Sequence, residues 1–337
     1  MRAMSLERPG PIATWPLRLV ERSDPSTGSA EILVRVRVCG VCRTDLHVIE
    51  GDLPPHRLPL VPGHQAVGVV EAVGRDCRRL ARGERVGIPW LRGTCGGCPA
   101  CRDGRENLCP GSVYSGYDED GGYAELALVS EAYAYRIPPV FADREAAPLL
   151  CAGIIGYRAL ERCRLPAGGR LGLYGFGSSA HVVLQIARHR GAEVFVATRG
   201  EEHRALARRL GAAWTAGVTD PMPGLLDSAI VFAPVGEIVP AALRAVRPGG
   251  TVALAGIHMT PIPPLDYTEC LFHEKTLTSV AANTRDDGEA LLREAAAVPV
   301  RPEATVFLLE AANEALAELR DGRLSGSGVL LVDPRAD

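Results

Sequence analysis

The sequence predicts an α/β protein that combines a β-rich domain with a doubly wound parallel sheet. Residues 1–148 contain short alternating apolar and polar runs separated by Gly, Pro and Asp, for example Glu31–Val38. This pattern is typical of antiparallel strands. From residue 149 onward, strand-like runs alternate with helical stretches, which is the succession of a parallel βαβ sheet. At 337 residues the chain is also long for one hydrophobic core, so two domains are expected.

In the first domain we expect an antiparallel barrel or sandwich without a long amphipathic helix, with strands that include 31–38, 67–73 and 122–129. In the second domain we expect strands at 170–174, 193–198, 228–232, 251–255 and 276–280, and helices at 178–190, 201–210 and 238–246. The tail adds a helix at 286–297, a strand at 304–308, a helix at 311–321 and a strand at 326–332. We expect this tail to return to the first domain, so the predicted domains are 1–148 with 285–337, and 149–284.

The composition excludes several classes of partner. Charged residues make up 23% of the chain, apolar residues 47%, and the net charge is −3, as in ordinary globular proteins. Without a basic tract, nucleic acid and anionic membranes are not expected as partners. No apolar run reaches the ~18 residues that span a bilayer. Residues 1–10 lack the apolar core of a signal peptide, so we expect the protein in the cytoplasm.

Four of the ten cysteines form a metal-binding pattern. Cys95, Cys98, Cys101 and Cys109 follow one another as C-x-x-C-x-x-C-x7-C. Two-residue gaps let successive thiolates converge on one ion, and a fourth closes a tetrahedron. The spacing fits a zinc ion with four sulfur ligands, and an iron–sulfur cluster has similar needs. A saturated ion has no open position for substrate, so this site is expected to be structural.

A glycine-rich loop lies between a predicted strand and a predicted helix. Gly175, Gly177 and Ala180 form G-x-G-x-x-A, with Ser178 and Ser179 between them. The glycines allow close approach of a pyrophosphate, and the helix N-terminus supplies N–H groups for it. This context predicts a dinucleotide site.

The end of the next predicted strand bears on which nicotinamide cofactor binds. The strand ends in Thr198 and Arg199, where an acidic residue would bind the ribose of NAD. A hydroxyl and a guanidinium can bind a 2′-phosphate, so NADP is preferred over NAD. The alternative is that Arg199 is a solvated surface residue and the enzyme uses either cofactor.

A polar cluster follows the strand at 31–38. It contains Cys42, Arg43, Thr44, Asp45 and His47. Taken alone, a single Cys or His is more often a core residue than a ligand, and Asp45 also fits a helix N-cap. Spacing alone therefore does not select a second metal site.

Together these motifs resemble the zinc-dependent alcohol dehydrogenases of the medium-chain dehydrogenase/reductase superfamily. The resemblance covers essentially the whole chain and rests on five stretches in order: 40–47, 62–64, the four-cysteine segment, 148–153 and 175–180. It implies a chaperonin-ten-like catalytic domain, split in sequence around a Rossmann domain. Family members are homodimers or homotetramers, and the same is expected here.

The resemblance also assigns roles to residues. Cys42, His64 and Cys151 match the ligands of a catalytic zinc, and the four-cysteine segment matches those of a structural zinc. Asp45 is expected to orient His64 from behind. Other matches are the proton relay of Thr44 and His47, the phosphate contact Arg43, and the substrate-pocket positions of Thr44, Leu53 and Trp90.

One position departs from the family pattern. The usual Gly-His-Glu is Gly63-His64-Gln65 in this chain. Glutamine is nearly isosteric with glutamate but uncharged, so we expect altered kinetics without loss of metal.

The resulting prediction is an enzyme that transfers a hydride between NAD(P)(H) and an alcohol or aldehyde, with two zinc ions per chain. A reductase of activated double bonds on the same fold is one alternative. A catalytically silent dinucleotide-binding protein is the other. The ligand set argues against the first, and the intact pair of Thr44 and His47 argues against the second.

Overall fold

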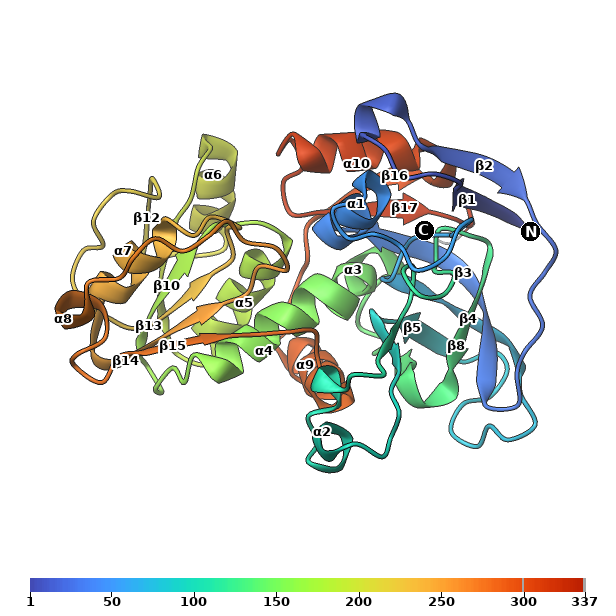
Figure 1. Cartoon of the computed structure of the whole chain (residues 1–337), viewed down its shortest axis with the longest axis horizontal. Coiled ribbons are helices and arrows are strands. Elements are labelled where there is room, and N and C mark those ends of the chain that lie inside the picture. The colour runs from blue at the N-terminus through green and yellow to red at the C-terminus, as the bar shows by residue number, and fades with distance from the viewer. Residues whose placement is uncertain (299, 336–337) are drawn as a thin grey trace. The chain divides into compact units, whose positions relative to one another are not determined.

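The computed structural model describes residues 1–298 and 300–335. It divides into two compact units. One comprises residues 1–151, 282–296 and 301–335, and the other comprises residues 152–281 with 297, 298 and 300. Figure 1 follows the elements of both units along the chain. None of the helices formed by the described residues combines the length and apolar character that crossing a bilayer requires.

The first unit is built on a mixed sheet. Among the described residues the sheet has seven strands in the order β16-β17-β3-β4-β5-β9, with β8 also paired to β3. The strands of this unit are β1 (Arg2–Leu6), β2 (Leu17–Glu21), β3 (Glu31–Val41), β4 (Ala66–Val73), β5 (Arg85–Ile88), β6 (Leu91–Gly93), β7 (Val113–Tyr114), β8 (Leu126–Ser130), β9 (Tyr135–Arg136), β16 (Ala304–Leu308) and β17 (Ser327–Leu331). Its helices are α1 (Arg43–Glu50), α2 (Pro99–Arg102), α3 (Asp143–Pro148), α9 (Arg285–Ala297) and α10 (Ala312–Arg320).

Strand β3 positions the polar cluster that follows it. Val34, Val36 and Val38 are buried in the core, whereas Arg35 is exposed, which is the alternation of a half-buried strand. Strand β4 pairs antiparallel with β3 and sets Ala66 opposite Cys39. The residues just after β3 therefore lie beside those just before β4. On its other side β3 pairs with β17, so the C-terminal tail belongs to the same sheet.

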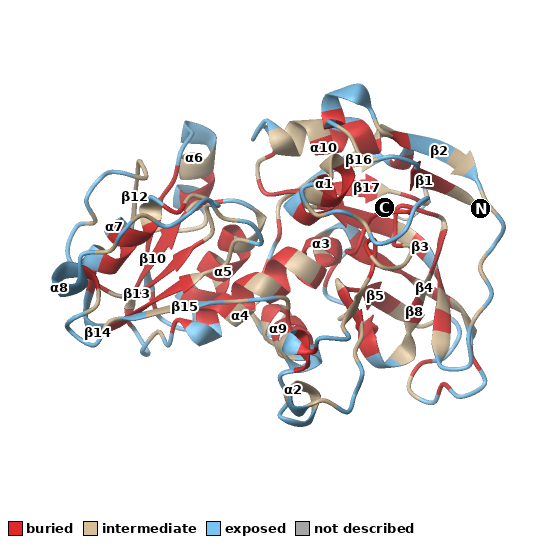
Figure 2. Ribbon diagram, viewed as in Figure 1, coloured by how far each residue is buried: buried red, intermediate tan, exposed pale blue. Residues whose placement is uncertain are grey.

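The second unit is a parallel sheet with helices. Among its described residues the sheet has six strands in the order β12-β11-β10-β13-β14-β15. The strands are β10 (Arg170–Tyr174), β11 (Glu193–Ala197), β12 (Trp214–Ala216), β13 (Leu226–Val231), β14 (Val246–Leu254) and β15 (Thr276–Ser279). The helices are α4 (Ile154–Arg162), α5 (Ser178–His189), α6 (Glu201–Arg209), α7 (Ile238–Ala245) and α8 (Tyr267–Cys270). Strands β10 and β13 are almost entirely buried (Figure 2), as expected for central strands of a parallel sheet.

The predicted fold class is confirmed, with local errors. The strand expected at 122–129 begins only at Leu126, because 122–125 form an irregular segment that meets β1 through an isolated bridge between Ala3 and Ala124. Elements that had not been predicted include the hairpin of β1 with β2, the short strand β12 and the helix α4. Helix α4 follows a π-helical turn at Leu149–Gly153, which disturbs the 3.6-residue period on which helix prediction depends.

Candidate active site

The first unit brings Cys42, His64 and Cys151 together. Each offers one ligand atom, and these atoms lie within 4.8 Å of one another. The Sγ of Cys42 is 3.1 Å from Nε2 of His64. Cys42 caps α1, His64 lies between β3 and β4, and Cys151 lies on the π-helical turn. Two thiolates and an imidazole match the donor set of a zinc site that keeps one position open, so the residues present fit this metal.

Asp45 fixes both the helix start and the histidine. Its Oδ2 accepts a hydrogen bond from the Cys42 N–H at 3.0 Å, and its Oδ1 lies 3.0 Å from Nδ1 of His64. Asp45 and His64 are both almost completely buried. The N-cap role considered above for Asp45 is wrong, because the N-cap of α1 is Cys42; Asp45 is the third helical residue, completes the capping box and also faces His64. With Nδ1 directed at Asp45, His64 presents Nε2 to the two cysteines.

The electrostatics of the cluster favour a thiolate at Cys42. Burial raises the pKa of Cys42, but hydrogen bonding with Cys151 and the charge of His64 outweigh burial and hold that pKa well below its usual value. Burial lowers the pKa of His64, yet Asp45 and Cys42 raise it well above its usual value. The hydrogen bond with Cys42 and burial raise the pKa of Cys151. A cation among the three would hold Cys151 as a thiolate as well.

The predicted relay residues both lie on α1. Thr44 is buried, and its N–H donates to the Cys42 sulfur at 3.3 Å. His47 is half-buried, and its Nδ1 lies 3.0 Å from Oδ2 of Asp52. Asp52 was not predicted as part of the site. Asp52 lies five residues after His47 and beyond the end of α1. Helical periodicity therefore does not predict that the two side chains meet.

Gln65 follows His64 in sequence and is almost completely buried. The main-chain carbonyl of Gln65 accepts a hydrogen bond from the Gly40 N–H at 3.0 Å. A Cβ at Gly40 would lie 3.0 Å from the Gln65 side chain, so the side chain packs directly over this glycine. Its Nε2 has no hydrogen-bond partner among the described residues. Arg43 is the first residue of α1 and is exposed.

The predicted substrate-pocket residue Trp90 adjoins the cluster. Its ring lies 4.9 Å from that of His64 in an edge-to-face arrangement. Leu53 and Trp90 are half-buried and pack against the same core. Tyr114 stacks on Trp90 at 4.7 Å, and Tyr117 lies at 5.8 Å. These two tyrosines had not been predicted as part of the site.

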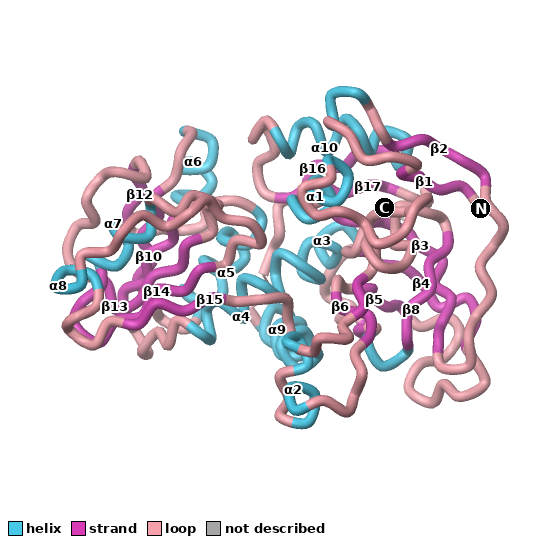
Figure 3. Tube along the Cα trace, in the orientation of Figure 1, coloured by secondary structure: helices cyan, strands magenta, loops and turns pink. Residues whose placement is uncertain are grey.

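The four-cysteine segment forms a second group of sulfur donors. The Sγ atoms of Cys95, Cys98, Cys101 and Cys109 lie within 4.8 Å of one another. The segment is mostly loop around the short helix α2 (Figure 3). The Gly97 N–H and the Cys109 thiol hydrogen-bond to the Cys95 sulfur and lower its pKa to about 6. Four sulfurs at this separation fit a saturated metal site.

In the second unit the glycine-rich loop joins β10 to α5. Gly175 has φ +91°, and a Cβ there would lie 2.9 Å from the Ala233 nitrogen, so both conformation and space require glycine. A Cβ at Gly177 would meet no atom within 4 Å. Space for a ligand therefore remains in front of the α5 N-terminus, where Ser178 and Ser179 are half-buried and Ala180 is buried.

Thr198 and Arg199 follow β11, which ends at Ala197, one residue before the predicted end of this strand. Thr198 is buried and Arg199 is exposed, and Arg199 makes no side-chain hydrogen bond or ion pair within residues 1–298 and 300–335. Arg204 of α6 also reaches this strand end, where its Nη1 donates to the Thr198 carbonyl at 3.1 Å. Glu201 is 2.9 Å from Arg204 Nε and pairs with Arg208. The strand end therefore carries two guanidinium groups and a carboxylate that is engaged by arginines.

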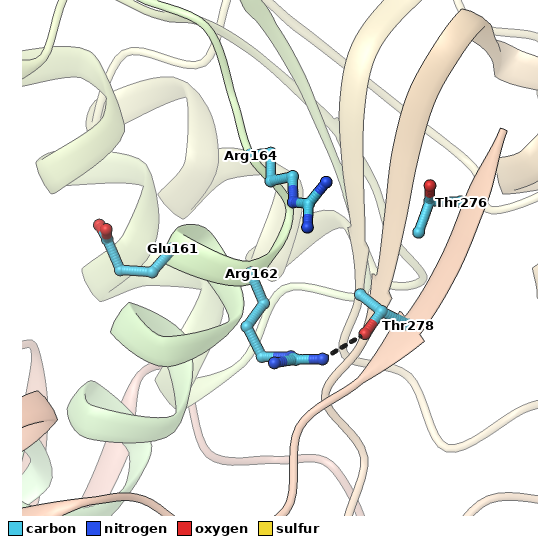
Figure 4. A pocket seen from close by; sticks show the side chains of 5 residues that line it. All are labelled: Glu161, Arg162, Arg164, Thr276 and Thr278. Carbon is cyan, nitrogen blue, oxygen red and sulfur yellow. Dashed lines mark hydrogen bonds between the residues drawn. The ribbon is translucent and has the colours of Figure 1, made fainter. Parts of the chain in front are cut away.

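A separate hollow of about 230 Å³ in the second unit is lined by charged and hydroxyl side chains (Figure 4): Glu161, Arg162, Arg164, Thr276 and Thr278. Arg162 donates to the Thr278 hydroxyl at 2.7 Å and to the Ser279 carbonyl at 3.0 Å. None of the predicted site residues lines this hollow.

Two family models match the chain. The alcohol dehydrogenase GroES-like domain matches residues 28–139, and the zinc-binding dehydrogenase domain matches residues 180–297. Among curated proteins, the probable alcohol dehydrogenase AdhA of Mycobacterium tuberculosis is 51% identical, over 98% of this chain and 97% of its own length. An alcohol dehydrogenase of Geobacillus stearothermophilus is 36% identical, over 94% of this chain and 97% of its own.

Solved structures give the same result. A cinnamyl alcohol dehydrogenase from Sorghum bicolor superposes with a TM-score of 0.87 at 28% identity, covering 98% of this chain and 97% of that one.

Proposed function

The chain belongs to the zinc-dependent alcohol dehydrogenases of the medium-chain dehydrogenase/reductase superfamily, and we propose that its reaction takes place at Cys42, His64 and Cys151. It is an oxidoreductase that uses zinc and a nicotinamide cofactor to interconvert alcohols and carbonyl compounds. The observation that carries the proposal is the convergence of the three donor atoms within 4.8 Å, with His64 oriented by a buried carboxylate.

Zinc held by these residues would act as a Lewis acid toward the substrate oxygen while hydride passes between the carbinol carbon and the nicotinamide. The residues of the chain then have three tasks. Cys42 and Cys151 supply negative charge, and Asp45 keeps His64 in the tautomer that leaves Nε2 for the metal. The buried Thr44 hydroxyl would accept the proton of the alcohol while it donates its own proton onward, and His47 would exchange a proton with solvent. Asp52 holds the His47 ring by its Nδ1 at 3.0 Å.

A structural zinc at the four cysteines is the second part of the proposal. Its support is the clustering of four sulfurs within 4.8 Å. We prefer zinc over an iron–sulfur cluster because four thiolates converging on one ion match the tetrahedral geometry of a structural zinc site.

We propose that NADP is preferred over NAD. The support is a strand end with Thr198 and Arg199 in place of a carboxylate, and the guanidinium of Arg204 beside it. Arg199 can bind a 2′-phosphate through charge-assisted hydrogen bonds, whereas Arg204 is paired with Glu201. Arg43 and the loop at Gly175–Ala180 are proposed to contact the other phosphates. A homodimeric or homotetrameric state and a cytoplasmic location remain predictions.

The test is the oxidation of NADPH and of NADH, measured separately by absorbance with a panel of aldehydes and repeated after a zinc chelator. The expected result is chelator-sensitive turnover that is faster with NADPH. Faster turnover with NADH would overturn the cofactor proposal and leave the reaction intact. Absence of aldehyde turnover with either cofactor would favour the double-bond reductase or the silent protein.

A further inference from the structure

A buried tyrosine packs against the residue that precedes the proposed ligand His64. Tyr123 has no exposed surface, and a Cβ at Gly63 would lie 2.3 Å from Cδ1 of its ring. Gly63 also has φ +97°, a conformation that favours glycine. The ring of Tyr123 therefore occupies space that only a glycine at position 63 leaves free.

Main-chain hydrogen bonds hold the segment of Tyr123 beside the segment that leads to His64. The Tyr123 N–H donates to the Pro62 carbonyl at 3.0 Å, and the Gly122 N–H donates to the Gly63 carbonyl at 2.8 Å. The ring is thus fixed by its own main chain and by Gly63. Because the whole side chain is buried, its hydroxyl must find a partner inside the protein instead of in solvent.

The hydroxyl of Tyr123 adjoins the Asp45 carboxylate. Burial raises the pKa of Tyr123 well above its usual value, and the charge of Asp45 and a hydrogen-bonding contact with it raise that pKa further. The hydroxyl therefore stays protonated and can donate. Among the described residues no acceptor meets it in full hydrogen-bonding geometry, and the Asp45 carboxylate is the acceptor within reach.

The Asp45 carboxylate has capacity for this donor. Its Oδ2 accepts from the Cys42 N–H at 3.0 Å, and its Oδ1 lies 3.0 Å from Nδ1 of His64. Each carboxylate oxygen can accept a second hydrogen bond. Asp45 is only 1% exposed, and a buried charge is costly unless donors surround it. A third donor would stabilise the charged carboxylate that orients His64.

We propose that Tyr123 is a positioning residue of the catalytic metal site. Its hydroxyl donates to Asp45 and holds the carboxylate in the orientation that directs Nε2 of His64 toward the metal. The inference rests on the proposed function, because it concerns the same three ligands. Tyr123 acts through Asp45 and His64, so its contribution is expected in zinc affinity.

The experiment compares the full-length wild type with Tyr123→Phe, which keeps the ring and removes the hydroxyl. Zinc affinity at the catalytic site is measured by competition with a chromogenic chelator. We expect Tyr123→Phe to weaken this affinity about 3- to 10-fold, the worth of one hydrogen bond. With Co2+ at the catalytic site, the visible absorption bands of the ion are expected to shift, because the orientation of His64 changes. Tyr135→Phe removes another buried tyrosine hydroxyl, 3.5 Å from Nδ2 of Asn283; it is the matched control and should equal the wild type in both readouts.

A double-mutant cycle with Asp45→Asn tests whether Tyr123 acts through Asp45. If it does, the costs of the two substitutions are not additive. Tyr123→Phe is then expected to change zinc affinity by less than about 2-fold in the Asp45→Asn background. An equal cost in both backgrounds would overturn the assignment. Unchanged zinc affinity in Tyr123→Phe, with a lower melting temperature of both the zinc-free and the zinc-loaded protein, would show a merely structural role and overturn it as well.

The outcomes separate this inference from the function on which it rests. Wild-type protein that holds zinc at both sites and turns over aldehydes, with unchanged zinc affinity in Tyr123→Phe, would overturn the role of Tyr123 and leave the proposed function intact. Wild-type protein that binds zinc only at the four cysteines would overturn the proposed catalytic site, and this inference with it.

Discussion

Replacing Asp45 with asparagine tests how much the buried carboxylate contributes to the catalytic metal site. The carboxylate accepts a hydrogen bond from the Cys42 N–H at 3.0 Å, and its other oxygen lies 3.0 Å from Nδ1 of His64 as an ion pair. Asparagine keeps the shape but offers one acceptor oxygen, and its NH2 group must then face a second donor. One of the two contacts is therefore lost in Asp45→Asn, and the charge is lost from both.

The expected loss of zinc affinity follows from the loss of one of these two contacts. A hydrogen bond to a charged group contributes about 1.5–3 kcal/mol, which corresponds to about 10- to 150-fold in an equilibrium constant. Removal of a carboxylate that orients a metal-bound histidine typically costs about 10- to 100-fold in metal affinity. We expect Asp45→Asn to weaken catalytic zinc by about 10- to 100-fold, with the structural zinc unaffected.

The assay is competition for zinc with a chromogenic chelator, read alongside the metal content of the protein. Asp52→Asn is the matched control, since this carboxylate contacts His47 instead of a proposed ligand and is 57% exposed at its side chain. The control should retain wild-type zinc affinity. Wild-type affinity in Asp45→Asn would refute the argument, because the lost contact would then not act on His64.

Three further predictions concern the other parts of the molecule. Cys98→Ser should remove the structural zinc and lower the melting temperature by several degrees. The control Cys77→Ser should keep both ions. Zinc content and thermal unfolding of the two variants test this prediction. Arg199→Asp should reduce the NADPH over NADH ratio of kcat/KM by about 10- to 100-fold, and Arg164→Asp should leave the ratio unchanged. Gln65→Glu should change kcat by up to about 10-fold at constant zinc content, and identical kinetics would contradict the role given to the missing charge.

The regular part of the fold was predictable because its signals are local. The buried strands of the second unit are short apolar runs, and Gly175 with Gly177 marks the turn from β10 into α5. Helix α4 was missed because its period is broken by Gly153 and Gly156 and by the π-helical turn before it. That turn carries Cys151. The π-helical turn that prevented the prediction of α4 therefore also positions a proposed metal ligand.

The candidate site also has a part that was predictable from local sequence and a part that was not. Cys42 and Asp45 lie within one helical turn, and antiparallel pairing brings Gln65 to Gly40, so sequence proximity and strand register account for much of the metal cluster. The contact between His56 and Tyr117 joins residues separated by 61 positions. Neither lies in a regular element, so no periodicity links them, and only the folded loops bring them together. Sequence proximity and strand register thus account for the metal ligands, whereas a contact between two irregular loops could not be predicted from the sequence.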